Sequence, residues 1–168
     1  MISGYQGQVA TSYGAAIELQ GAGTDLWHSI YAPTALTNTV PGILAYNVSS
    51  GVVQPIWLSA AQNTVMRNQV IVVDNSPLGL GTIPAGTWGF AKIRGYCLAD
   101  VLGAAGLAAE GDALELNGDQ DYFVDQTSNE GEIIDTTTSA IILEAYTTTE
   151  VADKSVYLLG TPCTIAAS

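Results

Sequence analysis

Short runs of β-branched and aromatic residues, each bounded by turn-forming residues, are the feature that most limits what this chain can fold into. Such runs predict strands, and a series of short strands at regular spacing is typical of a β-sandwich or β-barrel. The seven clearest runs lie at residues 51–58, 69–74, 87–96, 113–116, 121–124, 139–145 and 155–159. Between two of them, Asn117-Gly118 is a dipeptide typical of a two-residue type I′ hairpin turn.

Helical signals are weak in comparison. Residues 98–109 are rich in Ala and Leu, but Gly103 and Gly106 interrupt them, so a loop or a bulged strand is as good an interpretation as a helical turn. We therefore predict an all-β fold, either a small barrel or a jelly-roll-like sandwich.

Composition limits the kinds of partner. The 168 residues suit one domain, and 16 acidic against 4 basic residues give a net charge of −12. Such a chain repels nucleic-acid phosphates and anionic lipids, so we expect neither nucleic acid nor membrane as a partner. Only 12% of residues are charged. A surface with so little charge predicts that other protein chains cover much of it.

The chain divides into two regions by composition. Residues 1–40 carry glycine every few positions and show no steady apolar period, which predicts an extended N-terminal arm or an edge segment. Residues 41–168 contain most of the strand signals and form the predicted β domain. Within it, residues 100–135 hold ten acidic residues and no basic one, which is typical of a solvated, acidic surface.

Few residues suggest catalysis or a cofactor. The single histidine, His28, lies near Asp25 and Ser29, but no Gly-x-Ser-x-Gly nucleophile motif occurs, so we expect a histidine with a structural role. Cys97 and Cys163 are 66 positions apart, and with one histidine they cannot complete a usual zinc site. Reduced thiols that pack as small apolar residues are the simplest expectation, with a disulfide as the alternative. We predict no enzyme activity and no cofactor.

One acidic segment resembles part of a calcium-binding loop. Oxygen-bearing residues stand at positions 1, 3, 5 and 9 of such a loop, namely Asn117, Asp119, Asp121 and Asp125. Position 6 is Tyr122 instead of glycine, and position 12 is Ser128 instead of glutamate. A solvated acidic rim is therefore the expected arrangement, and a weak cation site between subunits is the alternative.

Four segments of the second half, taken in order, resemble a family of phage proteins. They are the Gly-led run 85–96, the turn 109–114 (Ala-Glu-Gly-Asp-Ala-Leu), the run 139–145 and the closing run 156–160. Together they are similar to the head decoration proteins of tailed bacteriophages, which are also called cement or capsid-stabilising proteins.

The resemblance implies a β-barrel or β-tulip subunit on the outer surface of an icosahedral capsid, often as a homotrimer. Members of the family bridge subunits of the major capsid protein and have no catalytic residues. An N-terminal segment often ties them to the shell, and here the matching contacts would come from Ile2, Tyr5, Val9, Tyr13 and Ile17. No secretory signal is visible in residues 1–5, so we expect synthesis in the host cytoplasm. The resemblance implies residence in the virion.

A different class of function fits the same composition. A jelly-roll carbohydrate-binding module on a virion fibre would need aromatic platforms for sugar rings, and three tryptophans could serve. They are Trp27, Trp57 and Trp88.

Overall fold

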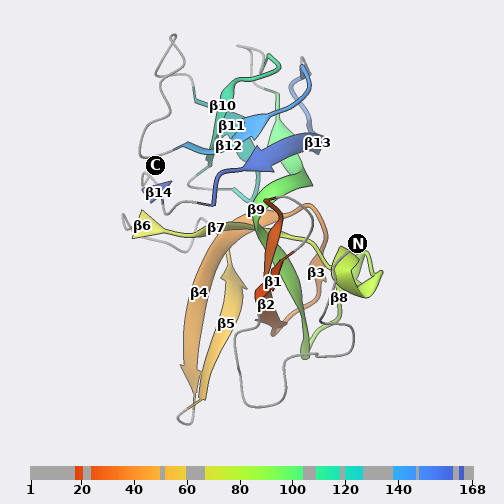
Figure 1. The fold of residues 1–168 in the computed structure, drawn as a ribbon, viewed down its shortest axis with the longest axis vertical. Coiled ribbons are helices and arrows are strands. Elements are labelled where there is room, and N and C mark those ends of the chain that lie inside the picture. The colour runs from red at the N-terminus through yellow and green to blue at the C-terminus, as the bar shows by residue number, and fades with distance from the viewer. Residues whose placement is uncertain are drawn as a thin grey trace.

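The structure is a computed structural model, and it confirms the all-β fold (Figure 1). It describes residues 18–20, 24–49, 52–59, 67–103, 109–117, 120–126, 138–146, 148–160 and 163–164. Within these residues, the helical content is one 3₁₀ turn, η2 (Ser76–Leu78).

Five strands form a closed barrel in the first half of the molecule, the lower half in Figure 1. In barrel order they are β2 (Leu26–Ala32), β5 (Val52–Leu58), β4 (Pro41–Ser49), β7 (Val70–Val73) and β9 (Thr87–Leu102). The pairing of β9 with β2 closes the ring. Closure gives each of these strands a paired neighbour on both sides, which reduces the unpaired edge that favours aggregation.

A second circuit of paired strands uses β9 again and fills the upper half of Figure 1. From β9 it runs through β11 (Phe123–Asp125), β10 (Ala113–Leu116), β12 (Thr138–Ile142) and β13 (Val151–Leu158), and then returns to β9. Strand β9 is thus the strand that both halves share.

Short strands lie outside these circuits. Strand β1 (Glu18–Gln20) pairs with β2 at one end of the large sheet. Two further pairs complete the described strands: β3 (Leu36–Thr37) with β8 (Thr82–Ile83), and β6 (Arg67–Asn68) with β14 (Cys163–Thr164).

Strand β9 changes partner at Gly95. Its residues 87–94 pair with β2, and its residues 95–102 pair with β13. The register shifts just before this point, between Leu26 and Trp27 of β2. Gly95 has φ +102°, a backbone conformation that residues other than glycine rarely adopt. A glycine at a bulge lets a long strand bend out of one sheet and into another.

Two hydrophobic cores lie on opposite faces of β7, whose four residues are all buried. Ile71 and Val73 belong to the core of the first barrel, and Val70 and Val72 to the core of the second half. Because successive strand residues point to opposite faces, one short strand serves both cores. A second tie between the halves joins Ser59 after β5 to Asp121 before β11, whose oxygens lie 2.6 Å apart.

Several sequence predictions are refined by this fold. Residues 98–102 are neither a loop nor a helical turn but the end of β9. The 113–125 hairpin exists, but its last strand pair is Leu116 with Phe123, so the predicted two-residue turn is wrong. Strands β2 and β3 lie within residues 1–40, the range predicted as an arm or edge segment, and β2 is part of the first barrel.

Candidate functional site

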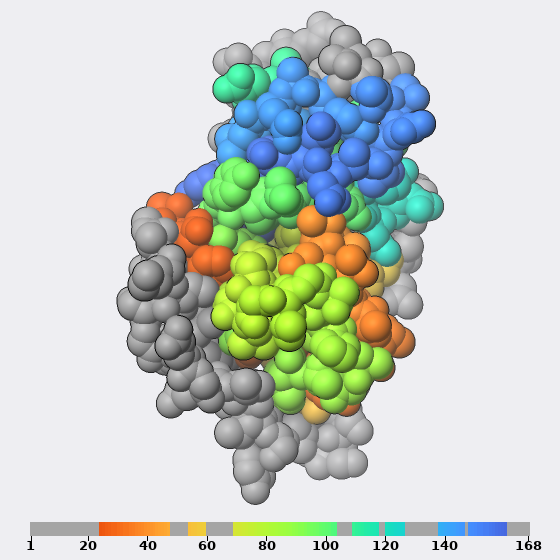
Figure 2. Space-filling model, turned by 90° about the vertical axis from the view of Figure 1, so that its right-hand side faces the viewer, coloured from red at the N-terminus to blue at the C-terminus, as the bar shows by residue number. Residues whose placement is uncertain are grey.

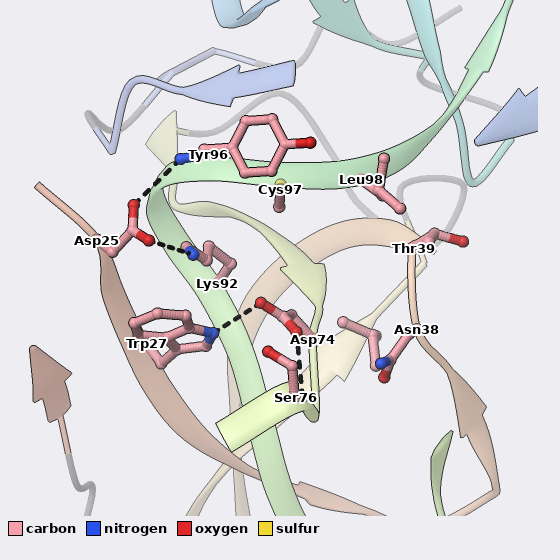
Figure 3. Close-up of a pocket in the computed structure, with 11 residues that line it drawn as sticks. Asp25, Trp27, Asn38, Thr39, Asp74, Ser76, Lys92, Tyr96, Cys97 and Leu98 are labelled. Atoms are coloured by element: carbon pink, nitrogen blue, oxygen red, sulfur yellow. Dashed lines mark hydrogen bonds and ion pairs between the residues drawn. The ribbon is translucent and has the colours of Figure 1, made fainter. Parts of the chain in front are cut away.

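A cleft of about 450 Å³ lies beside β9, where the two halves of the molecule meet (Figure 3). Its walls come from the start of β2, the loop between β3 and β4, the end of β7, η2 and the middle of β9. The lining residues used below are Asp25, Trp27, Thr39, Asp74, Lys92, Tyr96, Cys97 and Leu98.

The cleft wall holds a buried lysine. The side chain of Lys92 is only 3% exposed, and its Nζ lies 3.0 Å from Oδ2 of Asp25. The same Nζ stands 3.6 Å from the centroid of the Trp27 ring. A buried ammonium ion must be compensated, and here an ion pair and a cation–π contact share that task.

Two carboxylates frame this lysine, as Figure 3 shows. Oδ1 of Asp25 accepts a hydrogen bond from the backbone N–H of Tyr96, 3.2 Å away. On the other side, Nε1 of Trp27 donates to Oδ2 of Asp74 over 2.8 Å, and Oδ1 of Asp74 accepts from the N–H of Ser76. With two carboxylates and one ammonium, this group carries a net negative charge.

The arrangement supports structure rather than covalent chemistry. The ammonium of Lys92 is occupied by Asp25 and by the Trp27 ring. Burial raises the pKa of the Cys97 thiol to about 12, so at neutral pH it stays protonated and is a poor nucleophile. Cys97 is a free, buried thiol, which confirms the expectation of a reduced, packed cysteine at this position.

A pair of carboxyl groups lies at the rim of the cleft. Asp100 of β9 and Asp153 of β13 are direct cross-strand partners. Oγ1 of Thr39 lies 2.8 Å from Oδ1 of Asp100 and 3.0 Å from Oδ1 of Asp153. A hydroxyl carries one hydrogen and can donate it to only one of these oxygens at a time. When Asp100 is protonated, its carboxyl can donate a hydrogen bond to Asp153.

Thr39 is held firmly in this position. Its φ of +79° is unusual for a β-branched residue, and among the described residues it is the one non-glycine with positive φ. Its N–H donates to the carbonyl of Val73, and its own carbonyl accepts from the N–H of Asp100. The loop after β3 is thereby fastened to both halves of the molecule.

Protonation of Asp100 makes stability depend on pH. Burial, together with the hydrogen bond to Asp153, raises the pKa of Asp100 from 3.8 to about 6. The folded protein holds this proton more tightly than the unfolded chain does. The protonated carboxyl therefore contributes its full stabilisation at pH values below the pKa of Asp100 in the unfolded chain. It is lost as the pH rises through about 6.

We expect Asp100→Asn to stabilise the protein at high pH. The Asn amide can donate to Asp153 as the protonated acid does, at any pH. The free energy of unfolding should rise by about 1 kcal/mol near pH 8 and stay unchanged near pH 4. The expected rise is small because Asp100 is only partly buried. Urea denaturation at the two pH values measures the difference, with the exposed Glu110→Gln as the charge-matched control. An equal loss of stability at both pH values would contradict the protonation of Asp100.

The structure gives His28 a structural position. The ring is buried, and its Nδ1 lies 2.7 Å from the carbonyl oxygen of Ser29. Asp25 pairs with Lys92 and not with His28, and Ser29 is itself buried. The expectation of a structural histidine is therefore confirmed.

The predicted cation cluster is described for three of its four members, because Asp119 lies outside the described residues. Asp121 accepts a hydrogen bond from Ser59. Asp125 lies in β11, where burial and the nearby Asp112 carboxylate raise its pKa. Among the described residues, no group of three or more His, Cys, Asp or Glu side chains is placed to hold a metal ion.

The three tryptophans differ in what they offer a ligand. Trp27 is 6% exposed and its ring face is covered by Lys92, so the idea of a sugar platform there is wrong. Trp57 packs against the core of the first barrel. Trp88 is half-buried and stands edge-to-face against Tyr31, with the ring centroids 5.7 Å apart.

The predicted arm contacts cannot be placed in the same way. Ile2, Tyr5, Val9, Tyr13 and Ile17 lie outside the described residues. The cleft itself was not predicted from the sequence. Its central ion pair joins residues 67 positions apart. The one sign of it in the sequence is Lys92, a charged residue within a mostly apolar strand.

Comparison with known proteins gives one structural likeness. No protein-family model matches the chain, and no curated protein sequence matches it. Among solved structures, it is similar to the head fiber gp8.5 N base of bacteriophage phi29. The two chains are 11% identical, with a TM-score of 0.45, and the match covers 82% of this chain and 97% of the other. Within the described residues, no helix has the length and apolar character that crossing a bilayer requires.

Proposed function

We propose that this chain is a structural protein of a tailed-phage virion that decorates the capsid and bridges subunits of the major capsid protein. The observation that carries the proposal is how the segments resembling the decoration family come together. The runs at 85–96, 139–145 and 156–160 fall on β9, β12 and β13. The turn at 109–114 leads into β10, and these four strands belong to one circuit of pairing.

The surface is consistent with a protein that is covered by other chains. The charged share is 12%, and large apolar side chains are exposed on several strands, among them Tyr46, Tyr96, Leu98 and Val151. A clamp between capsid subunits buries such surface against its neighbours. The proposal includes a homotrimer and an outer position on the capsid, and it requires no catalytic residue, cofactor or metal.

The N-terminal residues supply the test. We expect deletion of residues 1–17 to reduce binding to capsids that lack the protein by at least about tenfold. The cut falls just before β1 (Glu18–Gln20), so the strand that pairs with β2 is kept. Co-sedimentation with such capsids measures binding, and circular dichroism checks that the β fold is intact.

Two substitution sets in the same segment make the test specific. One set replaces the five predicted apolar contacts by Ser, namely Ile2, Tyr5, Val9, Tyr13 and Ile17. The other set replaces polar residues of the same segment by Ser, namely Gln6, Gln8 and Thr11. Binding should be lost with the first set and kept with the second. Full binding of the deletion variant would overturn the role of the arm. Failure of the intact protein to bind any capsid would overturn the proposed function. So would a light-scattering measurement, made with capsids present, that shows only free single subunits of 17.4 kDa.

A further inference from the structure

The ribbon made by β9 and β13 has an outer face with several exposed side chains, and the loop residue Thr39 contacts this face at Asp100 and Asp153. Cross-strand pairing arranges its side chains in four rows, which we call the outer strip. The rows are Tyr96 with Tyr157, Leu98 with Ser155, Asp100 with Asp153, and Leu102 with Val151. Alternate residues of β9 point the other way, into the core.

Apolar side chains of the outer strip are unusually exposed. Tyr96 is 51% exposed, Leu98 47% and Val151 44%. Figure 2 looks onto this side, where green atoms of β9 lie between the blue atoms of β13 and the orange and yellow-green atoms of the first barrel. Tyr96 and Leu98 also line the cleft, so the strip and the cleft form one continuous surface.

Negative charge interrupts this apolar surface at one row. Asp100 and Asp153 stand side by side between Leu98 and Leu102, and Asp74 lies across the cleft. In the described part of the chain, none of the three carboxylates has a cationic partner.

The three basic side chains whose contacts the structure describes are engaged elsewhere. Lys92 pairs with Asp25, and Lys154 lies 3.8 Å from Glu144 and over the ring of Tyr146. Nε of Arg94 donates to the carbonyl of Thr24. A row of two adjacent carboxylates within an apolar surface is therefore complementary to a cation that another molecule supplies.

We propose that the outer strip docks an extended segment of a partner protein in which a Lys or Arg stands between two apolar residues, in the pattern apolar-x-basic-x-apolar. Same-side residues of an extended chain are about 6.6–6.8 Å apart, which is also the spacing between successive rows of the strip. One apolar side chain would then lie on Leu98, the basic one against the carboxylates of Asp100 and Asp153 beside the Thr39 hydroxyl, and the other apolar one on Leu102 and Val151.

A second copy of this chain is a poor occupant for the same face. The chain carries a net charge of −12, and a symmetric contact of two strips would bury the carboxylates of both copies without supplying a cation to either. The inference goes beyond the proposed function, because it names a different face from the N-terminal arm and holds for any partner with this pattern.

A short peptide tests the inference directly. The probe is acetyl-Ser-Leu-Thr-Arg-Thr-Leu-Ser-amide, and the control peptide has Gln in place of Arg. In ¹⁵N-labelled protein we expect the probe to shift the amide signals of β9 and β13 in the strip, with a Kd on the order of 0.1–1 mM. The control peptide should bind at least about fivefold more weakly.

Variants at exposed positions assign the contacts. Asp100→Asn with Asp153→Asn should weaken binding of the probe at least about fivefold, and so should Leu98→Ser. Glu110→Gln with Glu150→Gln removes the same charge outside the strip and should leave binding unchanged. The inference is overturned if the strip signals do not move at about 5 mM probe, or if Gln and Arg peptides bind alike. Strip signals that shift with protein concentration alone would show a second copy as the occupant, and would equally overturn it.

Discussion

Asp25→Asn should lower the free energy of unfolding by about 3–5 kcal/mol, because it leaves the buried ammonium of Lys92 without its counter-ion. Lys92 is 3% exposed and lies 3.0 Å from Asp25, so its ammonium depends on this carboxylate for most of its compensation. The Asn side chain keeps an oxygen for the N–H of Tyr96, so the change isolates the charge. A domain of ordinary stability would lose a large share of its 5–15 kcal/mol. Urea denaturation followed by circular dichroism measures the loss.

A double-mutant cycle separates the charge from other effects. Lys92→Met preserves the length of the side chain and removes its charge, so Asp25→Asn with Lys92→Met should recover most of the stability lost in Asp25→Asn. The matched control is the more exposed pair of Lys154 and Glu144, whose Nζ and Oε2 are 3.8 Å apart. The same cycle there should give a coupling several-fold smaller than that of Asp25 with Lys92. If Asp25→Asn stayed within about 1 kcal/mol of the wild type, the ion pair would not be what makes burial of Lys92 tolerable.

Gly95→Ala should be similarly damaging for a steric reason. A Cβ at this position would meet Oδ1 of Asp25 at 2.1 Å and its Cα at 2.9 Å. The carboxylate could only move by abandoning Lys92, and the Cα belongs to the backbone. The φ of +102° adds the cost of a conformation that Ala disfavours. We expect a loss of at least about 3 kcal/mol, measured by thermal and urea denaturation.

Gly111 provides the control for backbone conformation alone. Its φ is +97°, close to that of Gly95, but a Cβ there would meet nothing within 4 Å. Gly111→Ala should therefore cost only the backbone term, about 1 kcal/mol. Equal losses at the two positions would show that the contact with Asp25 is unimportant.

The fold class could be predicted from local patterns, whereas individual strands depended on their surroundings. The β7 run is a continuous apolar segment, and the β5 run holds β-branched and aromatic residues on both sides of Gln54 and Pro55; both are strands as predicted. Strand β2 was missed because His28 and Ser29 lie among its buried residues and hide the apolar pattern. The end of β9 stayed open between a loop, a bulged strand and a helical turn, because the small residues Cys97 and Ala99 form much of its buried side and give little strand signal.

The cleft and the outer strip could not be predicted because they depend on pairing across the whole chain. Asp25 and Lys92 meet only because β2 and β9 are neighbours in the barrel. Asp100 and Asp153 meet only through the register of β9 with β13. Sequence alone placed Asp100 in an acidic region and did not pair it with Asp153, because strand register is set by distant hydrophobic contacts.

Strand β9 also limits how such a protein can change over evolutionary time. Each of the two rings of strands is completed by a different stretch of this one strand. A gene fragment that encoded only the second half would lack Ile43, Val70 and Val72, which the first half contributes to the core of the second. Recombination can therefore pass on this architecture only as a whole, while the surface of each half remains free to diverge by point substitution.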